Sequence, residues 1–246
     1  MIADARTAVA FLTRIPVGAG ALDRDGLSRA AAWFPAVGLL VGGVMAGTRW
    51  LANLALDPAP ATVLALLAAV LVTGALHEDG LADTADAIGA HTTRARRLEI
   101  LRDSRVGAFG ALALVFAVAF ALTVLTPLDD AHFARAALVG HVLARWSTLP
   151  QALVLPPAHR DGSGAMLRPG RVAVAIGSAV AVATALVAGG ARPGAIALAS
   201  AVAITAIGAL AAVRALGGVS GDTFGAVAKL VALGSYAALA AAWAAS

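Results

Sequence analysis

The chain alternates between long apolar stretches and short polar ones, as expected for a protein that crosses a membrane several times. A helix crosses the ~30 Å hydrocarbon core of a bilayer with about 20 mostly apolar residues. Seven stretches approach that length: residues 30–54, 61–76, 108–125, 136–155, 172–188, 195–213 and 226–244. The second is short, so we expect its helix to continue through residues 77–90. The pattern predicts an all-α fold, a polytopic transmembrane helix bundle of about seven spans (six to eight), forming one domain over residues 1–246.

The composition agrees with a membrane protein and disfavours other classes. Hydrophobic residues make up 60% of the chain and charged residues 13%, with a mean hydropathy of +0.87. A typical soluble domain has about 25% charged residues, and a disordered chain is much less apolar. The sequence contains no cysteine, which excludes disulfides, thiolate metal ligands and cysteine nucleophiles.

The basic residues are distributed unevenly between the loops. If Arg49 and Lys229, near the ends of their stretches, are counted with the adjacent loops, 14 of the 18 Lys and Arg residues precede the first stretch or follow an even-numbered one. Three lie in the other loops, and Arg145 lies well inside a stretch. The positive-inside rule therefore places the N-terminus and the arginine-rich loops in the cytoplasm. All but Lys229 are arginines. We interpret them as residues that set the orientation in the membrane and contact phosphate groups, and we expect no nucleic-acid partner.

The densest polar segment is residues 77–86 (HEDGLADTAD). On a helix, Asp79, Asp83 and Asp86 at i, i+4 and i+7 share one face, where like charges repel. A divalent cation would relieve this repulsion, and oxygen-only ligands suit Mg²⁺ or Mn²⁺. The alternative is a solvated acidic helix end balanced by nearby arginines.

A second segment, residues 98–110 (LEILRDSRVGAFG), combines arginines and glycines. Arg102 and Arg105 are suited to bidentate phosphate binding. Gly107 and Gly110 would let backbone amides approach an anion at the start of the next span. Equally, these arginines could set topology alone and the glycines could serve packing.

Three further features carry candidate chemistry. Arg145 lies within the fourth stretch, one turn after His141, and an ionisable residue inside a membrane is a candidate functional residue. The glycine-rich residues 217–225 (GGVSGDTFG) contain Asp222, which could join a metal site, bind a ribose hydroxyl or cap the last helix. Residues 11–16 (FLTRIP) have the amphiphilic pattern of an interfacial anchor.

Taken in order, the FLTRIP, HEDGLADTAD, LEILRDSRVGAFG and GGVSGDTFG segments resemble the cobalamin synthase family, also called adenosylcobinamide-GDP ribazoletransferase. The resemblance covers nearly the whole chain. It departs at Ala87, because the family often has Asp-Gly at the end of the acidic block. The resemblance implies a multi-pass protein of the bacterial cytoplasmic (inner) membrane, embedded in the lipid bilayer, with its active site facing the cytoplasm.

The same resemblance implies the reaction. Adenosylcobinamide-GDP would be joined to α-ribazole or α-ribazole 5′-phosphate with release of GMP, in a reaction that depends on Mg²⁺, with Mn²⁺ as an alternative. A homo-oligomer, or an association with other corrinoid-assembly enzymes, is left open.

Individual residues carry over by their place in the matching segments. Asp79, Asp83 and Asp86 would be metal ligands and, with Arg105, catalytic residues. The substrate-binding residues would be Asp103, Ser104, Gly107, Gly110, Arg145, Gly221, Asp222 and Thr223. Which Asp accepts the proton of the attacking hydroxyl is left open.

Two other functions compete with this one. A CDP-alcohol phosphotransferase would need a glycine where Ala87 follows Asp86, and further spaced acids that are missing here. A cation-coupled transporter would need acids near the membrane midplane and usually a repeated half. The acids of this chain are expected at one membrane face.

Overall fold

The structure is a computed structural model that describes residues 1–18, 23–159 and 162–245. Arg160, one of the arginines counted above, lies outside these ranges. Within them the regular secondary structure is helical, apart from an isolated β-bridge between Pro157 and Val219. The helices are α1 (Ile2–Leu12), α2 (Arg24–Ala30), the 3₁₀ turn η1 (Ala31–Trp33), α3 (Phe34–Ala52), α4 (Pro58–Thr73), α5 (Leu76–Gly89), α6 (Arg94–Ile100), α7 (Ala108–Leu125), α8 (Asp130–Val154), α9 (Ser163–Met166), α10 (Arg171–Gly189), α11 (Ala191–Leu216) and α12 (Gly221–Ala244).

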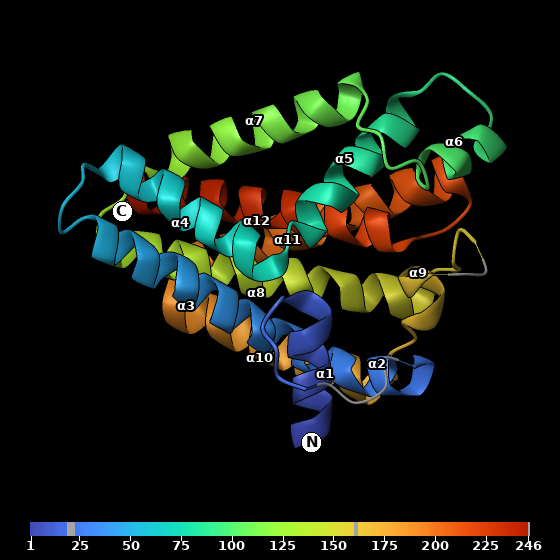
Figure 1. The fold of residues 1–246 in the computed structure, drawn as a ribbon. Helices are drawn as coiled ribbons and strands as arrows, with labels where there is room; N and C mark the ends of the chain where they lie inside the picture. The colour runs from blue at the N-terminus through green and yellow to red at the C-terminus, as the bar shows by residue number, and fades with distance from the viewer. Residues whose placement is uncertain (19–22, 160–161, 246) are drawn as a thin grey trace.

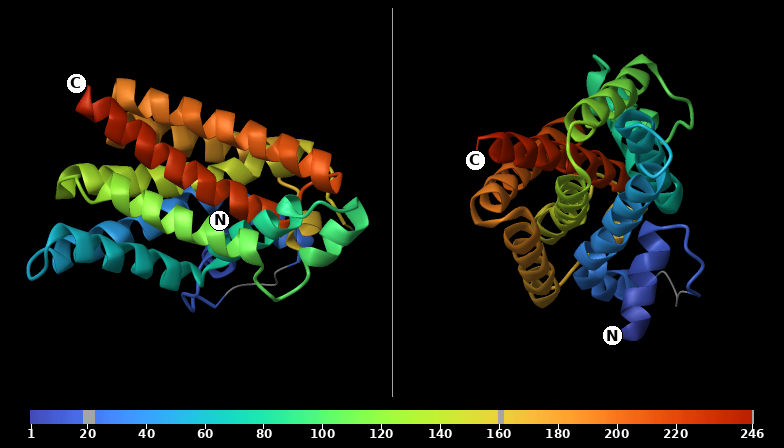
Figure 2. Two further views of the ribbon diagram at one scale, coloured as in Figure 1. Left: turned by 90° about the horizontal axis from the view of Figure 1, so that it is seen from above. Right: turned by 90° about the vertical axis from the view of Figure 1, so that its left-hand side faces the viewer.

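The long helices form one bundle around α8 (Figures 1 and 2). Helix α8 packs against α3, α10, α11 and α12, and the end-on view in Figure 2 shows it among them. Figure 1 places the connections from α5 to α7, from α8 to α10 and from α11 to α12 at one end of the bundle. We call this the motif end, because the acidic, arginine-rich and glycine-rich segments all lie there.

The number of helices able to span a membrane is close to the expected seven but lower. Five helices are long and apolar enough, or six if α4 and α5 together count as one broken span. Helix α8, which covers the predicted span 136–155, is long enough but carries buried polar residues such as Arg145 and Gln151. Because other helices surround α8, these side chains face protein instead of lipid, and the helix does not need an apolar surface.

The expected continuation of the second span is wrong, because the helix breaks at Gly74 and Ala75. Both residues are left-handed, with φ of 63° and 60°, and the axes of α4 and α5 meet at 88°. Gly74 ends α4 at little steric cost, whereas the left-handed conformation of Ala75 is uncommon for a residue with a Cβ. This break turns α5 away from α4 toward the motif end.

Several arginines have structural contacts in addition to any effect on topology. They donate hydrogen bonds to carbonyl oxygens at or just beyond helix C-termini, where positive charge is favoured. The pairs are Arg49 with Leu128 (2.8 Å), Arg94 with Leu216 (2.6 Å) and Arg168 with Leu155 (2.8 Å). Such contacts join helices at both ends of the bundle.

Candidate active site

Helix α5 presents the acidic face that the sequence predicts. Its opposite side is buried through residues such as His77, Leu81 and Ala87. Asp79 is exposed, while Asp83 and Asp86 are half-buried. The 3.6-residue period therefore separates a packed apolar side of α5 from a carboxylate-bearing side.

A close helix crossing adds a fourth carboxylate to this face. Gly80 of α5 lies against the start of α12, so that a Cβ there would come within 2.6 Å of the Asp222 carbonyl oxygen and 3.1 Å of the Gly225 Cα. Without side chains at these two glycines, the helix backbones approach closely. Asp83 consequently lies within electrostatic reach of Asp79, Asp86 and Asp222.

The turn before α12 leaves Asp222 available to this cluster. The Thr223 backbone N–H donates a hydrogen bond to the Ser220 hydroxyl (3.2 Å), and the Ser220 N–H donates one to the Thr223 hydroxyl (2.8 Å). Ser220 is therefore the N-cap, and the alternative of Asp222 as the cap is wrong. Thr223 is 1% exposed, so its hydroxyl shapes the turn, and its contact with substrate stays a prediction. Gly221 and Asp222 line a pocket together with Asp79.

Asp86 makes contacts that differ from those of the other acids. The Gly107 N–H donates to its Oδ2 (2.7 Å) and the Gly110 N–H to its Oδ1 (2.9 Å). The amides at the start of α7 thus bind an anion, as the sequence suggests, but that anion is a carboxylate of the protein itself. Asp86 joins α5 to α7, and both of its oxygens already accept hydrogen bonds.

Arg105 lies on the loop before α7 and does not contact the acidic cluster in this conformation. Its guanidinium binds Asp103 with two nearly parallel bonds, the shorter of 2.6 Å, and its side chain is 83% exposed. These hydrogen bonds from Arg105 lower the pKa of Asp103 to about 2. Ser104, between them, is exposed. The structure therefore brings Asp103 and Arg105 together at the rim of the site.

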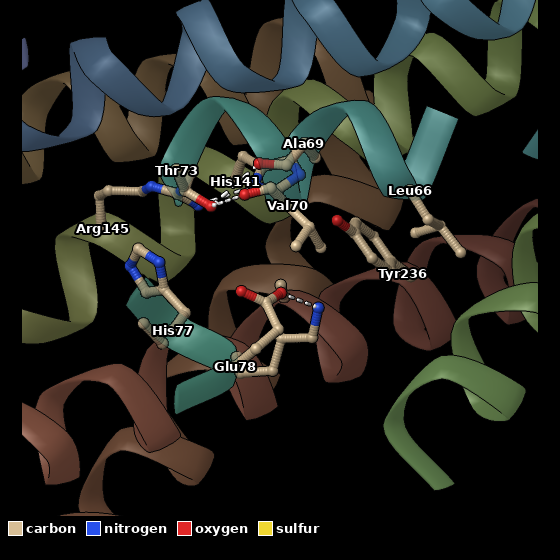
Figure 3. Close-up of a pocket in the computed structure, with 12 residues that line it drawn as sticks. Leu66, Ala69, Val70, Thr73, His77, Glu78, His141, Arg145 and Tyr236 are labelled. Carbon is tan, nitrogen blue, oxygen red and sulfur yellow. Dashed lines mark hydrogen bonds and ion pairs between the residues drawn. The ribbon is translucent and has the colours of Figure 1, made fainter. Parts of the chain in front are cut away.

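A cavity inside the bundle contains Arg145, which is 3% exposed. Its guanidinium donates to Nδ1 of His141 (2.6 Å), one turn earlier on α8, while its Nε has no partner in the described part of the chain. Other polar residues that line the cavity, most of them labelled in Figure 3, are Thr73, His77, Glu78, Lys229 and Tyr236. Because His77 lines both this cavity and the pocket of Asp79 and Asp222, Arg145 lies behind the acidic face and not on it.

The ion pair between Glu78 and Lys229 is missed by the sequence reasoning. The Lys229 Nζ and the Glu78 Oε1 are 2.7 Å apart, and the side chains of Glu78 and Lys229 are only 18% and 17% exposed. One signal was available, because Lys229 is the only lysine of the chain and falls within a predicted span. A charged residue at such a position usually has a partner.

The donor set fits Mg²⁺ or Mn²⁺ in chemistry, but the three expected ligands are not assembled around one point. Among the described residues, no group of three or more His, Cys, Asp or Glu is close enough to hold an ion. Mg²⁺ in phosphoryl-transfer sites is usually held by one or two carboxylates plus substrate phosphates. One or two of Asp79, Asp83 and Asp222 can serve in that way, while Asp86, whose oxygens also accept two backbone amides, stays a predicted ligand.

Comparison with known proteins identifies the family. A sequence model described as cobalamin-5-phosphate synthase matches residues 4–240. An adenosylcobinamide-GDP ribazoletransferase from Roseiflexus sp. is 35% identical over 234 residues, which are 92% of this chain and 86% of the relative. Relatives of the same name from Mesorhizobium japonicum and Bradyrhizobium diazoefficiens are 37% and 41% identical, over 92% and 73% of this chain and 88% and 72% of their own lengths. No solved structure matches significantly.

The match extends over nearly the whole chain, and it includes the acidic face of α5, the start of α7 and the turn before α12. The relatives named above share a single enzyme name. The chain therefore belongs to the cobalamin-5-phosphate synthase family of enzymes.

Proposed function

We propose that this protein joins adenosylcobinamide-GDP to α-ribazole or α-ribazole 5′-phosphate, giving adenosylcobalamin or its 5′-phosphate and GMP. The observation that carries the proposal is the family match over residues 4–240. The grouping of Asp79, Asp83 and Asp222 at the motif end supports it, because phosphoryl transfer depends on charge neutralisation and in-line positioning.

The reaction breaks one phosphoanhydride bond and forms one phosphoester bond. The ribose 3′-hydroxyl oxygen of the acceptor attacks the phosphorus bonded to the aminopropanol arm of the corrinoid. The bond between this phosphorus and the bridging oxygen of the pyrophosphate breaks, and GMP leaves with that oxygen. The hydroxyl proton passes to a base, which we assign to one of the carboxylates of Asp79, Asp83 and Asp222. Asp86 is less suited, because the Gly107 and Gly110 amides hold its oxygens.

One or two of these carboxylates, together with phosphate oxygens of the substrate, are proposed to hold the metal ion. They supply the hard oxygen donors that Mg²⁺ and Mn²⁺ prefer. When bound there, the ion would neutralise the pyrophosphate charge. The acids need this compensation themselves, since Asp83 faces three other carboxylates.

The direct test is release of GMP by the purified protein in lipid, given adenosylcobinamide-GDP and α-ribazole. We expect GMP and a corrinoid with its nucleotide loop closed, in equal amounts. A CDP-alcohol phosphotransferase or a cation-coupled transporter would form neither product, so their absence from active, folded protein would reject the proposal.

Arg105 is proposed to bind the pyrophosphate, and Arg105→Lys tests whether its planar fork is needed. Asp103 already orients the guanidinium, and a lysine keeps the charge but loses the two-bond geometry. We expect Arg105→Lys to slow GMP release by roughly 10- to 100-fold. This is the rate effect of losing one charge-assisted hydrogen bond that forms mainly in the transition state.

The control for this comparison is Arg102→Lys, measured at equal protein levels in the membrane. Arg102 is exposed three residues earlier on the same loop, and its replacement should change the rate of GMP release only slightly. If Arg105→Lys releases GMP as fast as the parent, Arg105 is only a loop charge that flanks α7.

We also propose that the motif end faces the cytoplasm of a bacterial inner membrane, where the nucleotide substrate is available. The chain has no cysteine, so single cysteines can report the side of the membrane. Thr92→Cys and Gly170→Cys, both exposed at the motif end, should react with a thiol reagent that crosses the membrane and not with an impermeant one added outside. Asp57→Cys, on the exposed connection between α3 and α4, should react with an impermeant reagent from outside. Labelling of Thr92→Cys from the periplasm would reverse the topology.

A further inference from the structure

Residues 11–16, whose pattern suggests an interfacial anchor, are also bound to the break between α4 and α5. The Arg14 N–H donates to the Val72 carbonyl oxygen (2.7 Å). Thr13 is buried, its hydroxyl donates to the Val9 carbonyl (2.7 Å), and the Ile15 N–H donates back to that hydroxyl (3.2 Å). The backbone around Arg14 is therefore held in place from both sides.

The side chain of Arg14 extends from this fixed backbone across the break. It packs over Gly74 so closely that a Cβ at Gly74 would overlap it. Its stem is thus positioned by packing, while the residue as a whole is exposed. Within residues 1–18, 23–159 and 162–245, no hydrogen bond or ion pair engages its guanidinium.

A pocket of about 440 Å³ lies beside the break, with Arg14 and Asp79 both in its lining. This volume is within the range of small-molecule sites, about 300–1,000 Å³. Asp79 and Leu76 also line the neighbouring pocket that contains Asp222, so the two pockets adjoin. Arg14 and Asp79 form no ion pair, so an oriented cation and a carboxylate face the same space without neutralising each other.

We infer that this pocket is a phosphate subsite in which the Arg14 guanidinium binds phosphoryl oxygens of a substrate. A guanidinium matches the geometry of phosphate oxygens, and the absence of a carboxylate partner leaves its donors available to a ligand. The inference rests on the proposed function for its substrates. Two sources supply the same chemistry: the pyrophosphate of adenosylcobinamide-GDP and the 5′-phosphate of α-ribazole 5′-phosphate.

The test uses Arg14→Gln, which keeps much of the stem that packs over Gly74 but removes the charge. We expect a 10- to 100-fold fall in kcat/KM for GMP release, the scale of one lost charge-assisted bond. Arg14→Lys should recover part of it. Arg24→Gln, another exposed arginine near the N-terminus, serves as the matched control and should match the parent.

The two acceptors distinguish the phosphate that Arg14 binds. If it binds the pyrophosphate, Arg14→Gln loses the same factor with α-ribazole and with its 5′-phosphate. If it binds the acceptor phosphate, the loss is confined to the KM for α-ribazole 5′-phosphate. Unchanged kcat and KM for both acceptors would overturn the inference.

Binding of inorganic pyrophosphate to the full-length protein in lipid, with Mg²⁺, separates this inference from the proposed function. Weaker pyrophosphate binding by Arg14→Gln, with no GMP release even by the parent, would leave the subsite standing and reject the proposed function. If the parent releases GMP, and Arg14→Gln releases GMP and binds pyrophosphate equally well, the proposed function stands and the subsite is rejected. Thermal unfolding of each variant in lipid checks that the α4–α5 break has been kept.

Discussion

Replacing Asp83 by Asn is expected to lower the rate of GMP release by about 10²-fold or more, the scale of losing one preorganised electrostatic group. Asp83 lies in the middle of the acidic face, within electrostatic reach of Asp79, Asp86 and Asp222. Asparagine keeps nearly the same shape but removes the charge that would hold a metal ion or accept a proton. The folded protein should tolerate this change, since it relieves repulsion among four carboxylates.

The matched control is Asp129→Asn at the other end of the bundle. Asp129 caps α8 through the His132 N–H (2.8 Å), and asparagine caps a helix about as well as aspartate. Activity of this variant should therefore stay close to that of the parent. Chelation with EDTA should abolish GMP release, and Mg²⁺ or Mn²⁺ should restore it. Full activity in EDTA, or in Asp83→Asn, would reject the carboxylate–metal assignment.

Gly80→Ala is expected to damage both activity and stability. The new Cβ would meet the Asp222 carbonyl oxygen at 2.6 Å and the Asp222 Cα at 3.1 Å, so α5 and α12 would have to separate. Overpacking of this kind costs about 1–3 kcal/mol. The separation would also move Asp222 away from Asp79 and Asp83, and we expect GMP release to fall at least tenfold, with a lower thermal unfolding midpoint.

Gly43→Ala is the comparison that isolates the close approach from the loss of a glycine. Gly43 lies within α3, and a Cβ there would meet no atom within 4 Å. Alanine favours a helix over glycine by about 1 kcal/mol, so this variant should be as stable as the parent or more stable. If Gly80→Ala behaves like Gly43→Ala, the tight crossing of α5 and α12 is not needed for the site.

Local periodicity accounts for what the sequence predicts correctly. A helix is built from bonds between residues four apart, so the spacing of Asp79, Asp83 and Asp86 was enough to place them on one face of α5. The same rule placed His141 one turn from Arg145. Long apolar runs likewise identified most of the helices that are long and apolar enough to cross a membrane, because length and hydropathy can be read from the sequence alone.

Partners distant in the sequence were decided by packing. Asp86 stays a predicted metal ligand, but its bonds from the Gly107 and Gly110 amides could not be foreseen, because they exist only where α7 starts beside α5. Helix α8 is less apolar than a lipid-facing span because four helices surround it. Neither feature follows from a periodic pattern in the sequence, because each depends on which helices become neighbours in the folded chain.

The break at Gly74 and Ala75 is the tertiary feature on which the site depends most. The apolar run and the acidic run looked like one continuous helix, because neither glycine nor alanine alone prevents helix formation. Only in the folded chain does the Arg14 N–H bind the Val72 carbonyl next to the break, and only there does α5 turn onto α12. The sequence by itself thus determined the helices and their acidic face, whereas the packing of distant segments decided which cations and carboxylates share one site.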